Sequence, residues 1–201
     1  MRGDRISIGA GALLVLALLY YVSSPGEAAA LALPVAAHEL GHVAAFYLLG
    51  LRIEGLSLEL KGFCIRYSGY TGALGHAAAA LAGPLAGLSY AFAAARLAER
   101  LALPWLELSA GLSLLLTLFN LLPALPLDGG RALSALACAL MGERAGNTLT
   151  ESLGLLCGIV LLCAGLWLMT QGRGIGLELA AVWLLLYQDT GQGLVKNREM
   201  I

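Results

Sequence analysis

The stretch His38-Glu39-Leu40-Gly41-His42 (HELGH) lies inside a long apolar run from Ala28 to Leu51. Residues four apart on a helix lie one turn apart on the same face, so a helix here presents both imidazoles in one direction. Two such histidines can hold one tetrahedral zinc ion, and a glutamate beside the first stands where a general base is needed. The spacing therefore predicts a metal site with His38 and His42 as ligands and Glu39 as the catalytic base.

The apolar setting strengthens this interpretation. A charged group at the middle of a membrane span costs roughly 2.5–3.5 kcal/mol on insertion scales, so such groups are usually functional. The alternative is that the two histidines are buried and hydrogen-bonded, while Glu39 reaches toward the membrane surface.

The composition is typical of a polytopic membrane protein. The 201 residues are 59% hydrophobic and 12% charged, whereas a soluble domain carries about 25% charged residues. Several apolar runs approach the roughly 20 residues that a helix needs to cross a bilayer. The net charge of −1 comes with no basic patch, so we expect no nucleic-acid partner.

We expect an all-α polytopic membrane protein forming a single metallopeptidase domain over residues 1–201, with its core at 28–142. About six transmembrane helices are predicted, at residues 6–22, 28–51, 72–97, 105–122, 152–170 and 175–187. The sixth segment is short enough to be interfacial instead. Thr148 and Glu151 have the spacing of a capping box, which predicts that the fifth span opens there.

A small membrane-associated β-hairpin is predicted at residues 53–70, between the second and third spans. Apolar and polar residues alternate on both sides of Lys61-Gly62, which is the period of a strand with one apolar face. The apolar set is Leu56, Leu58, Leu60, Phe63, Ile65 and Tyr67. The hairpin either offers an edge to an extended peptide or merely fills the helical bundle.

The third span is rich in alanine and glycine. Gly83 and Gly87 form a G-x-x-x-G step, which lets another helix approach closely. His76, near the start of this span, is interpreted as an interfacial polar residue rather than a ligand.

The fourth span ends in the segment Asn120 to Gly130, NLLPALPLDGG. Two prolines followed by two glycines do not continue a helix, and irregular backbone at membrane depth is tolerated only inside protein or along a wet cavity. Asp128 in this segment is the best available third zinc ligand, because a carboxylate oxygen binds zinc and a catalytic site leaves one position for water. The alternative is that Asp128 caps the helix that follows it.

Lys and Arg residues predict the orientation. With a cytoplasmic N-terminus and six spans, nine of the twelve lie inside and only Arg96, Arg100 and Arg173 lie outside, as the positive-inside rule requires. We therefore expect both termini, HELGH, the hairpin and Asp128 on the cytoplasmic side of a prokaryotic plasma membrane.

Together these residues resemble the site-2 protease family of intramembrane zinc metallopeptidases. The resemblance rests on HELGH, on Ala82-Gly83-Pro84 and on NLLPALPLDGGR at Asn120 to Arg131, and covers about Ala28 to Ala135. It implies one zinc ion per chain held by His38, His42 and Asp128, with Glu39 as catalytic acid and base. It also implies that Asn120 helps to position the substrate and that the hairpin guides it.

The short architecture most resembles the branch that contains the sporulation stage IV peptidase, which processes pro-sigma-K, in a form without the CBS domain that many members carry. The function expected from this resemblance is zinc-dependent cleavage of a membrane-spanning or membrane-associated protein, releasing a transcription regulator. A membrane regulatory protein is a second expected partner. The alternatives are a catalytically silent zinc-binding membrane protein and a metal-ion transporter.

Overall fold

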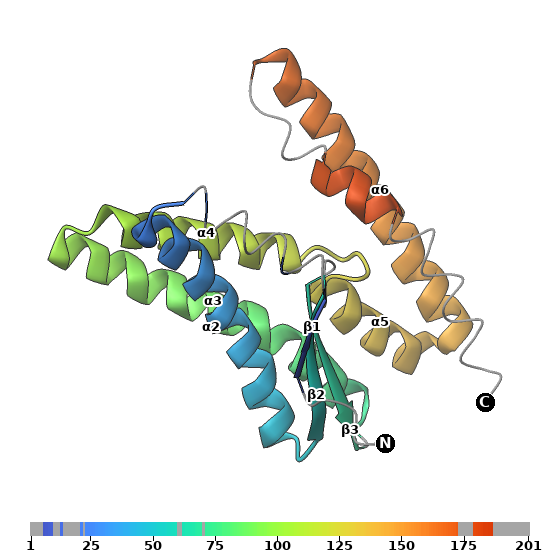
Figure 1. Cartoon of the computed structure of the whole chain (residues 1–201). Coiled ribbons are helices and arrows are strands. Elements are labelled where there is room, and N and C mark those ends of the chain that lie inside the picture. The colour runs from blue at the N-terminus through green and yellow to red at the C-terminus, as the bar shows by residue number, and fades with distance from the viewer. Residues whose placement is uncertain are drawn as a thin grey trace. The chain divides into compact units, whose positions relative to one another are not determined.

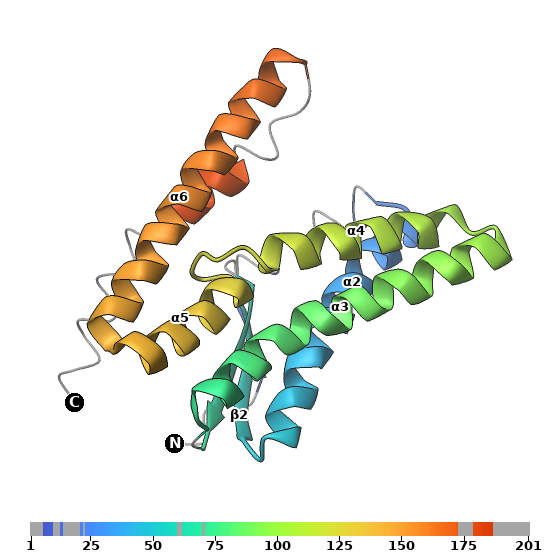
Figure 2. The same cartoon turned by 180° about the vertical axis from the view of Figure 1, so that it is seen from behind.

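The computed structural model describes residues 6–9, 13, 21, 23–59, 62–69, 71–172 and 179–186. The chain forms two compact units, residues 1–118 and 119–201, and helices dominate both of them (Figures 1 and 2). The first unit contains β1 (Ile6–Ile8), α2 (Pro25–Leu48), β2 (Arg52–Glu59), β3 (Gly62–Ser68), α3 (Ala73–Leu101) and most of α4 (Pro104–Asn120). The second contains α5 (Asp128–Met141) and α6 (Glu143–Thr170), and residues 179–186 are also helical.

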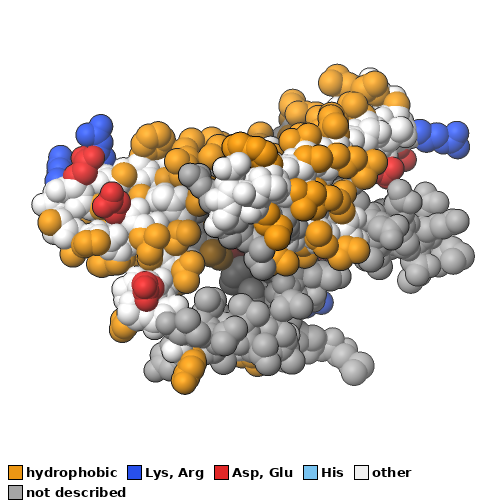
Figure 3. All heavy atoms as spheres, turned by 90° about the horizontal axis from the view of Figure 1, so that it is seen from above, with side chains coloured by type: hydrophobic (Ala, Val, Ile, Leu, Met, Phe, Trp, Pro, Cys, Tyr) orange, Lys and Arg blue, Asp and Glu red, His pale blue; other side chains and the backbone are white. Residues whose placement is uncertain are grey.

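The predicted helical membrane architecture is confirmed. Among the described residues, α2, α3 and α6 are long and apolar enough to cross a membrane, while α4 is a shorter helix of 17 residues. Hydrophobic side chains predominate over the coloured surface in Figure 3. The number of membrane crossings and their orientation stay predictions.

The first and last predicted spans lie largely outside the described residues. The expectation of a helix beginning at Ile6 is wrong, because Ile6–Ile8 forms β1. Of the predicted segment 175–187, residues 179–186 are helical, whereas Glu178 and the other positions fall outside the description.

α2 begins at a capping box that sequence reasoning overlooked. The Ser24 side chain accepts a hydrogen bond from the Glu27 backbone N–H at 3.3 Å, and a Glu27 carboxylate oxygen accepts one from the Ser24 N–H at 2.8 Å. Pro25 occupies the first helical position, where its missing N–H costs nothing. These local signals explain why the helix starts three residues before the predicted Ala28.

The predicted hairpin is confirmed, and a third strand joins it. β2 and β3 pair antiparallel, with Ser57 opposite Cys64 and a register shift between Ile53 and Gly55. β1 pairs with β2 in parallel, with Ser7 beside Ser57, so the strand order is β1-β2-β3. The side chains of Leu56, Leu58, Leu60 and Phe63 lie outside the described residues.

Aromatic contacts join β3 to the flanking helices. The rings of Phe46 in α2 and Tyr67 in β3 stack with their centroids 4.6 Å apart. The Tyr67 hydroxyl lies 3.4 Å from Nδ1 of His76, near the start of α3. The sheet therefore stands beside the end of α2 and the start of α3.

The predicted start of the fifth span is wrong. α6 already begins at Glu143, after Gly142, whose φ of 84° suits glycine. The Thr148 hydroxyl is inside the helix and donates to the carbonyl of Arg144 at 2.9 Å, so it caps nothing. α6 can start early because Gly146 has no side chain, and a Cβ there would stand 2.6 Å from the Cα of Cys138 in α5.

Candidate metal centre

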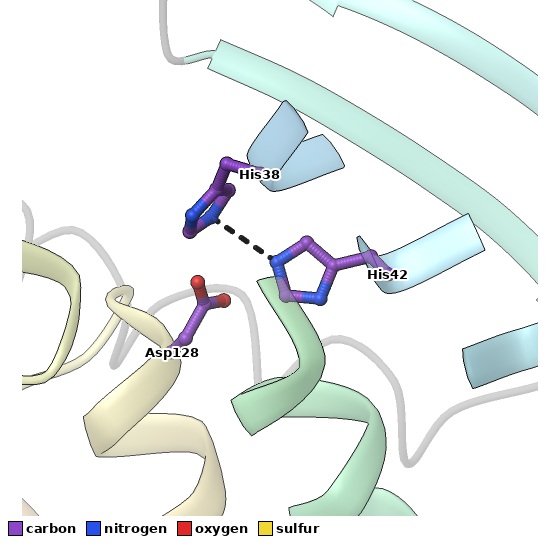
Figure 4. A group of neighbouring side chains, drawn as sticks. All are labelled: His38, His42 and Asp128. Atoms are coloured by element: carbon purple, nitrogen blue, oxygen red, sulfur yellow. Dashed lines mark hydrogen bonds between the residues drawn. The ribbon is translucent and has the colours of Figure 1, made fainter. Parts of the chain in front are cut away.

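The two histidines of HELGH lie on one face of α2, as their spacing predicts. His38 and His42 are buried, at 5% and 8% exposure, and their Nε2 atoms are 3.2 Å apart (Figure 4). Two nitrogens bound to one tetrahedral zinc at 2.0–2.1 Å lie about 3.3 Å apart. The pair therefore has the separation that a shared zinc ion requires.

A backbone carbonyl fixes the orientation of His42. Its Nδ1 lies 2.8 Å from the carbonyl oxygen of Ala79 in α3. A carbonyl only accepts hydrogen bonds, so Nδ1 carries the proton and Nε2 keeps the lone pair that a metal needs. The main chain of α3 thus selects the tautomer suited to metal binding.

Glycines make room for this arrangement where α2 packs on α3. A Cβ on Gly83 would collide with the imidazole of His42, coming within 2.6 Å of Cε1 and 2.8 Å of Cδ2. A Cβ on Gly41, inside HELGH, would collide with the carbonyl of Ala82 and stand 2.6 Å from the Cβ of Ala86. The two helices therefore approach closely at the G-x-x-x-G step, as predicted, and Gly83 leaves the space that the His42 imidazole occupies.

Asp128 is the first residue of α5 and is buried, at 5% exposure. The N-cap is Leu127, with no side-chain capping bond, so Asp128 is not the capping residue that the alternative interpretation assumed. Its Oδ1 lies 3.9 Å from Nη1 of Arg131. A carboxylate in the first turn also meets the positive end of the helix dipole.

The segment before Asp128 is irregular, as predicted from its prolines and glycines. It folds back over the start of α5, and the peptide bond between Leu125 and Pro126 is cis. A Cβ on Gly129 would stand 2.6 Å from the carbonyl oxygen of Leu122, and a Cβ on Gly130 would stand 2.5 Å from that of Ala124. The two glycines therefore permit the fold-back that presents Asp128.

The structure groups His38, His42 and Asp128, with one ligand atom of each lying within 4.8 Å of the others (Figure 4). Two imidazole nitrogens and one carboxylate oxygen form a donor set that zinc accepts, and three protein ligands leave a fourth position open for water or substrate. The residues present therefore fit a catalytic zinc ion.

The other two predicted site residues are Glu39 and Asn120. Glu39 follows His38 in α2 and is half-buried, and Asn120 is the last residue of α4 and is also half-buried. Their roles as catalytic and substrate-positioning residues stay predictions.

The sequence did not reveal the residues that shape the site through a backbone carbonyl or through the lack of a side chain. Ala79 contributes a carbonyl, which any residue could supply, so no sequence signal marks it. Gly83 and Gly87 were recognised as a helix-packing step, but not as neighbours of the histidines.

Comparison with known proteins finds similarity to metalloproteases. Residues 73–165 match Peptidase family M50. The chain is 33% identical over 185 residues to the protein named "Putative zinc metalloprotease Rip3" of Mycobacterium tuberculosis, in both the Erdman and H37Rv strains. The aligned region covers 84% of this chain and 44% of each relative, so the chain spans less than half the length of these curated relatives.

A solved structure shares the fold. The site-2 protease from Methanocaldococcus jannaschii superimposes with a TM-score of 0.68 at 22% sequence identity. The match covers 94% of this chain and 92% of that one. The helices and sheet described above therefore have the architecture of a site-2 protease.

Proposed function

We propose that the chain belongs to peptidase family M50, the site-2 protease family, and is a zinc-dependent endopeptidase that cleaves membrane-embedded proteins, since residues 73–165 match that family and its curated relatives and a solved structure carry protease names. The observation that supports this most directly is the buried group of His38, His42 and Asp128. The three come from separate parts of the sequence and offer zinc ligands with a position to spare.

In this proposal the three side chains hold one zinc ion. A zinc ion bound there supplies Lewis acidity, which activates water as a nucleophile and polarises the scissile carbonyl. Glu39 takes a proton from the attacking water and delivers it to the departing amine. The Asn120 side-chain amide donates a hydrogen bond to the substrate carbonyl oxygen, where negative charge develops.

The proposed substrate is a membrane-spanning or membrane-associated protein whose cleavage releases a transcription regulator. A helical substrate has its carbonyls hydrogen-bonded, so it must unwind locally before attack. We therefore expect helix-breaking residues near the cleaved bond. The apolar helices α2, α3 and α6 support a membrane location, whereas a sporulation role has no support beyond the sequence resemblance.

The decisive experiment replaces Glu39 with glutamine in the purified full chain. The probe is a set of fluorescent single-span peptides that carry Gly, Pro or Asn at mid-span. We expect Glu39→Gln to retain zinc while cleavage falls by about 10²–10⁴-fold, because the proton acceptor is gone and the ligands remain. Glu99→Gln, at an exposed position in α3, is the matched control and should cleave normally.

Three results would contradict the proposal. Undiminished cleavage by Glu39→Gln would remove Glu39 from the chemistry. A wild-type chain that binds zinc but cleaves no peptide of the set would favour the silent zinc-binding protein, and zinc transport into vesicles without cleavage would favour the transporter.

A further inference from the structure

Helix α4 carries three buried hydroxyl groups on one face. Ser109, Ser113 and Thr117 follow one another at intervals of four residues, which places them on one side of the helix. All three are at most 2% exposed. Buried hydroxyls in an apolar helix usually find hydrogen-bond partners, often on a neighbouring helix.

The two serines follow this rule. The Ser109 Oγ lies 2.7 Å from the Tyr90 hydroxyl of α3. The Ser113 hydroxyl donates to the carbonyl oxygen of Gly87, also in α3, at 2.8 Å. The burial of both serines is therefore explained by hydrogen bonds that hold α3 and α4 together.

Thr117 does not follow the rule that buried hydroxyls find hydrogen-bond partners. Its Oγ1 is buried and has no hydrogen-bond partner among the residues that the structure describes. A threonine in a helix can bond back to the carbonyl four residues earlier, as Thr148 and Thr150 do in α6. Since an unpartnered buried hydroxyl is destabilising compared with an apolar group of the same shape, helix packing alone does not explain Thr117.

The hydroxyl of Thr117 lies beside the metal centre. The point where a Cβ of Gly87 would stand is 2.7 Å from Thr117 Oγ1 and 3.8 Å from Nδ1 of His38. Both polar atoms thus border the same glycine, and the lack of a side chain there lets them approach. A hydroxyl both donates and accepts, so it can serve Nδ1 through one bridging water molecule.

We propose that Thr117 is a positioning residue for the metal centre, whose hydroxyl orients the His38 imidazole through Nδ1 so that Nε2 faces the metal. Metal-binding histidines almost always have a hydrogen-bond partner on the other ring nitrogen. Ala79 supplies it to His42, and in this proposal the Thr117 hydroxyl would supply it to His38 through a bridging water molecule. This inference rests on the proposed zinc site, and all its residues belong to the first compact unit.

The test compares three variants of the purified full chain. Thr117→Val removes the hydroxyl and keeps the volume, Thr117→Ser keeps the hydroxyl, and Ser113→Ala removes a neighbouring hydroxyl on the same face as a matched control. Zinc affinity is measured by competition with a chelator, and thermal unfolding is measured on the metal-stripped protein. The visible absorption of bound Co²⁺ reports the geometry at the metal.

We expect Thr117→Val to bind zinc about 10–100-fold more weakly, which is the usual effect of losing such a partner, and to shift the Co²⁺ bands. The metal-stripped valine variant should unfold at no lower temperature than wild type. Thr117→Ser and Ser113→Ala should keep wild-type zinc affinity, although Ser113→Ala should unfold at a lower temperature because it loses a bond between helices.

Wild-type zinc affinity in Thr117→Val would overturn the inference, and so would an equal loss of affinity in Ser113→Ala. If the valine variant does not fold, Thr117→Ala and Thr117→Ser decide, since both are smaller than threonine and only serine keeps the hydroxyl; equal affinities would overturn the inference. Wild-type zinc affinity in His38→Ala would instead refute the proposed zinc site itself.

Discussion

Replacing Gly83 with alanine adds one methyl group directly against a proposed metal ligand. The new Cβ would stand 2.6 Å from Cε1 and 2.8 Å from Cδ2 of His42. Non-bonded carbons prefer separations of about 3.5–4.0 Å, so the imidazole would have to withdraw by roughly 1 Å. Metal–ligand bonds tolerate deviations of only about 0.2 Å, so we expect His42 to leave its ligating position or to hold it under strain.

The size of the effect follows from the packing. Overfilling a packed interior typically costs about 1–3 kcal/mol, which corresponds to roughly 5–150-fold in an equilibrium constant. We expect zinc affinity to fall by at least about 5-fold. Alanine in a helix interior is otherwise more favourable than glycine by about 1 kcal/mol, so backbone propensity does not account for the loss.

The assay is chelator competition for zinc, together with thermal unfolding of the metal-stripped chain. Gly111→Ala is the matched control, because Gly111 lies inside α4 and a Cβ there meets nothing within 4 Å. That variant should bind zinc normally and unfold at the same or a slightly higher temperature. Full zinc affinity in Gly83→Ala would refute the assignment of His42 as a ligand held against α3.

Two further substitutions test the second unit. Asp128→Asn removes the negative charge but keeps the shape of the side chain. We expect zinc affinity to fall by more than the roughly 10–100-fold that follows the loss of a hydrogen-bond partner of a metal ligand. Normal zinc retention would leave Asp128 only an electrostatic role at the start of α5. Gly129→Ala places a Cβ 2.6 Å from the carbonyl oxygen of Leu122, and we expect stability to fall by about 1–3 kcal/mol in thermal unfolding. An unchanged unfolding temperature would show that the irregular segment before Asp128 shifts to accommodate the new Cβ without loss of stability.

Local sequence rules succeeded where their cause is also local. The shared face of His38 and His42 follows from the helical repeat alone. The irregular backbone before Asp128 follows from Pro123, Pro126 and the two glycines, whose backbone preferences act within a few residues. The hairpin follows from alternation on both sides of a turn.

The same rules failed where distant contacts decided. Ile6–Ile8 is apolar enough for a helix, yet it pairs with β2, some fifty residues away in the sequence. Thr148 and Glu151 have the capping-box spacing, but contact between α5 and α6 at Gly146 lets the helix begin earlier. In both cases tertiary packing outweighed a local signal in the sequence.

By itself, the sequence determined which side chains could bind a metal, because the donor atoms, their helical spacing and the breaks around Asp128 are local properties. Only the tertiary structure decided how the imidazoles are held, through the Ala79 carbonyl and the space at Gly83 and Gly87. The physical reason is that a carbonyl can orient an imidazole, and a missing side chain can make room for one, only when another helix packs against it. That contact depends on the whole fold.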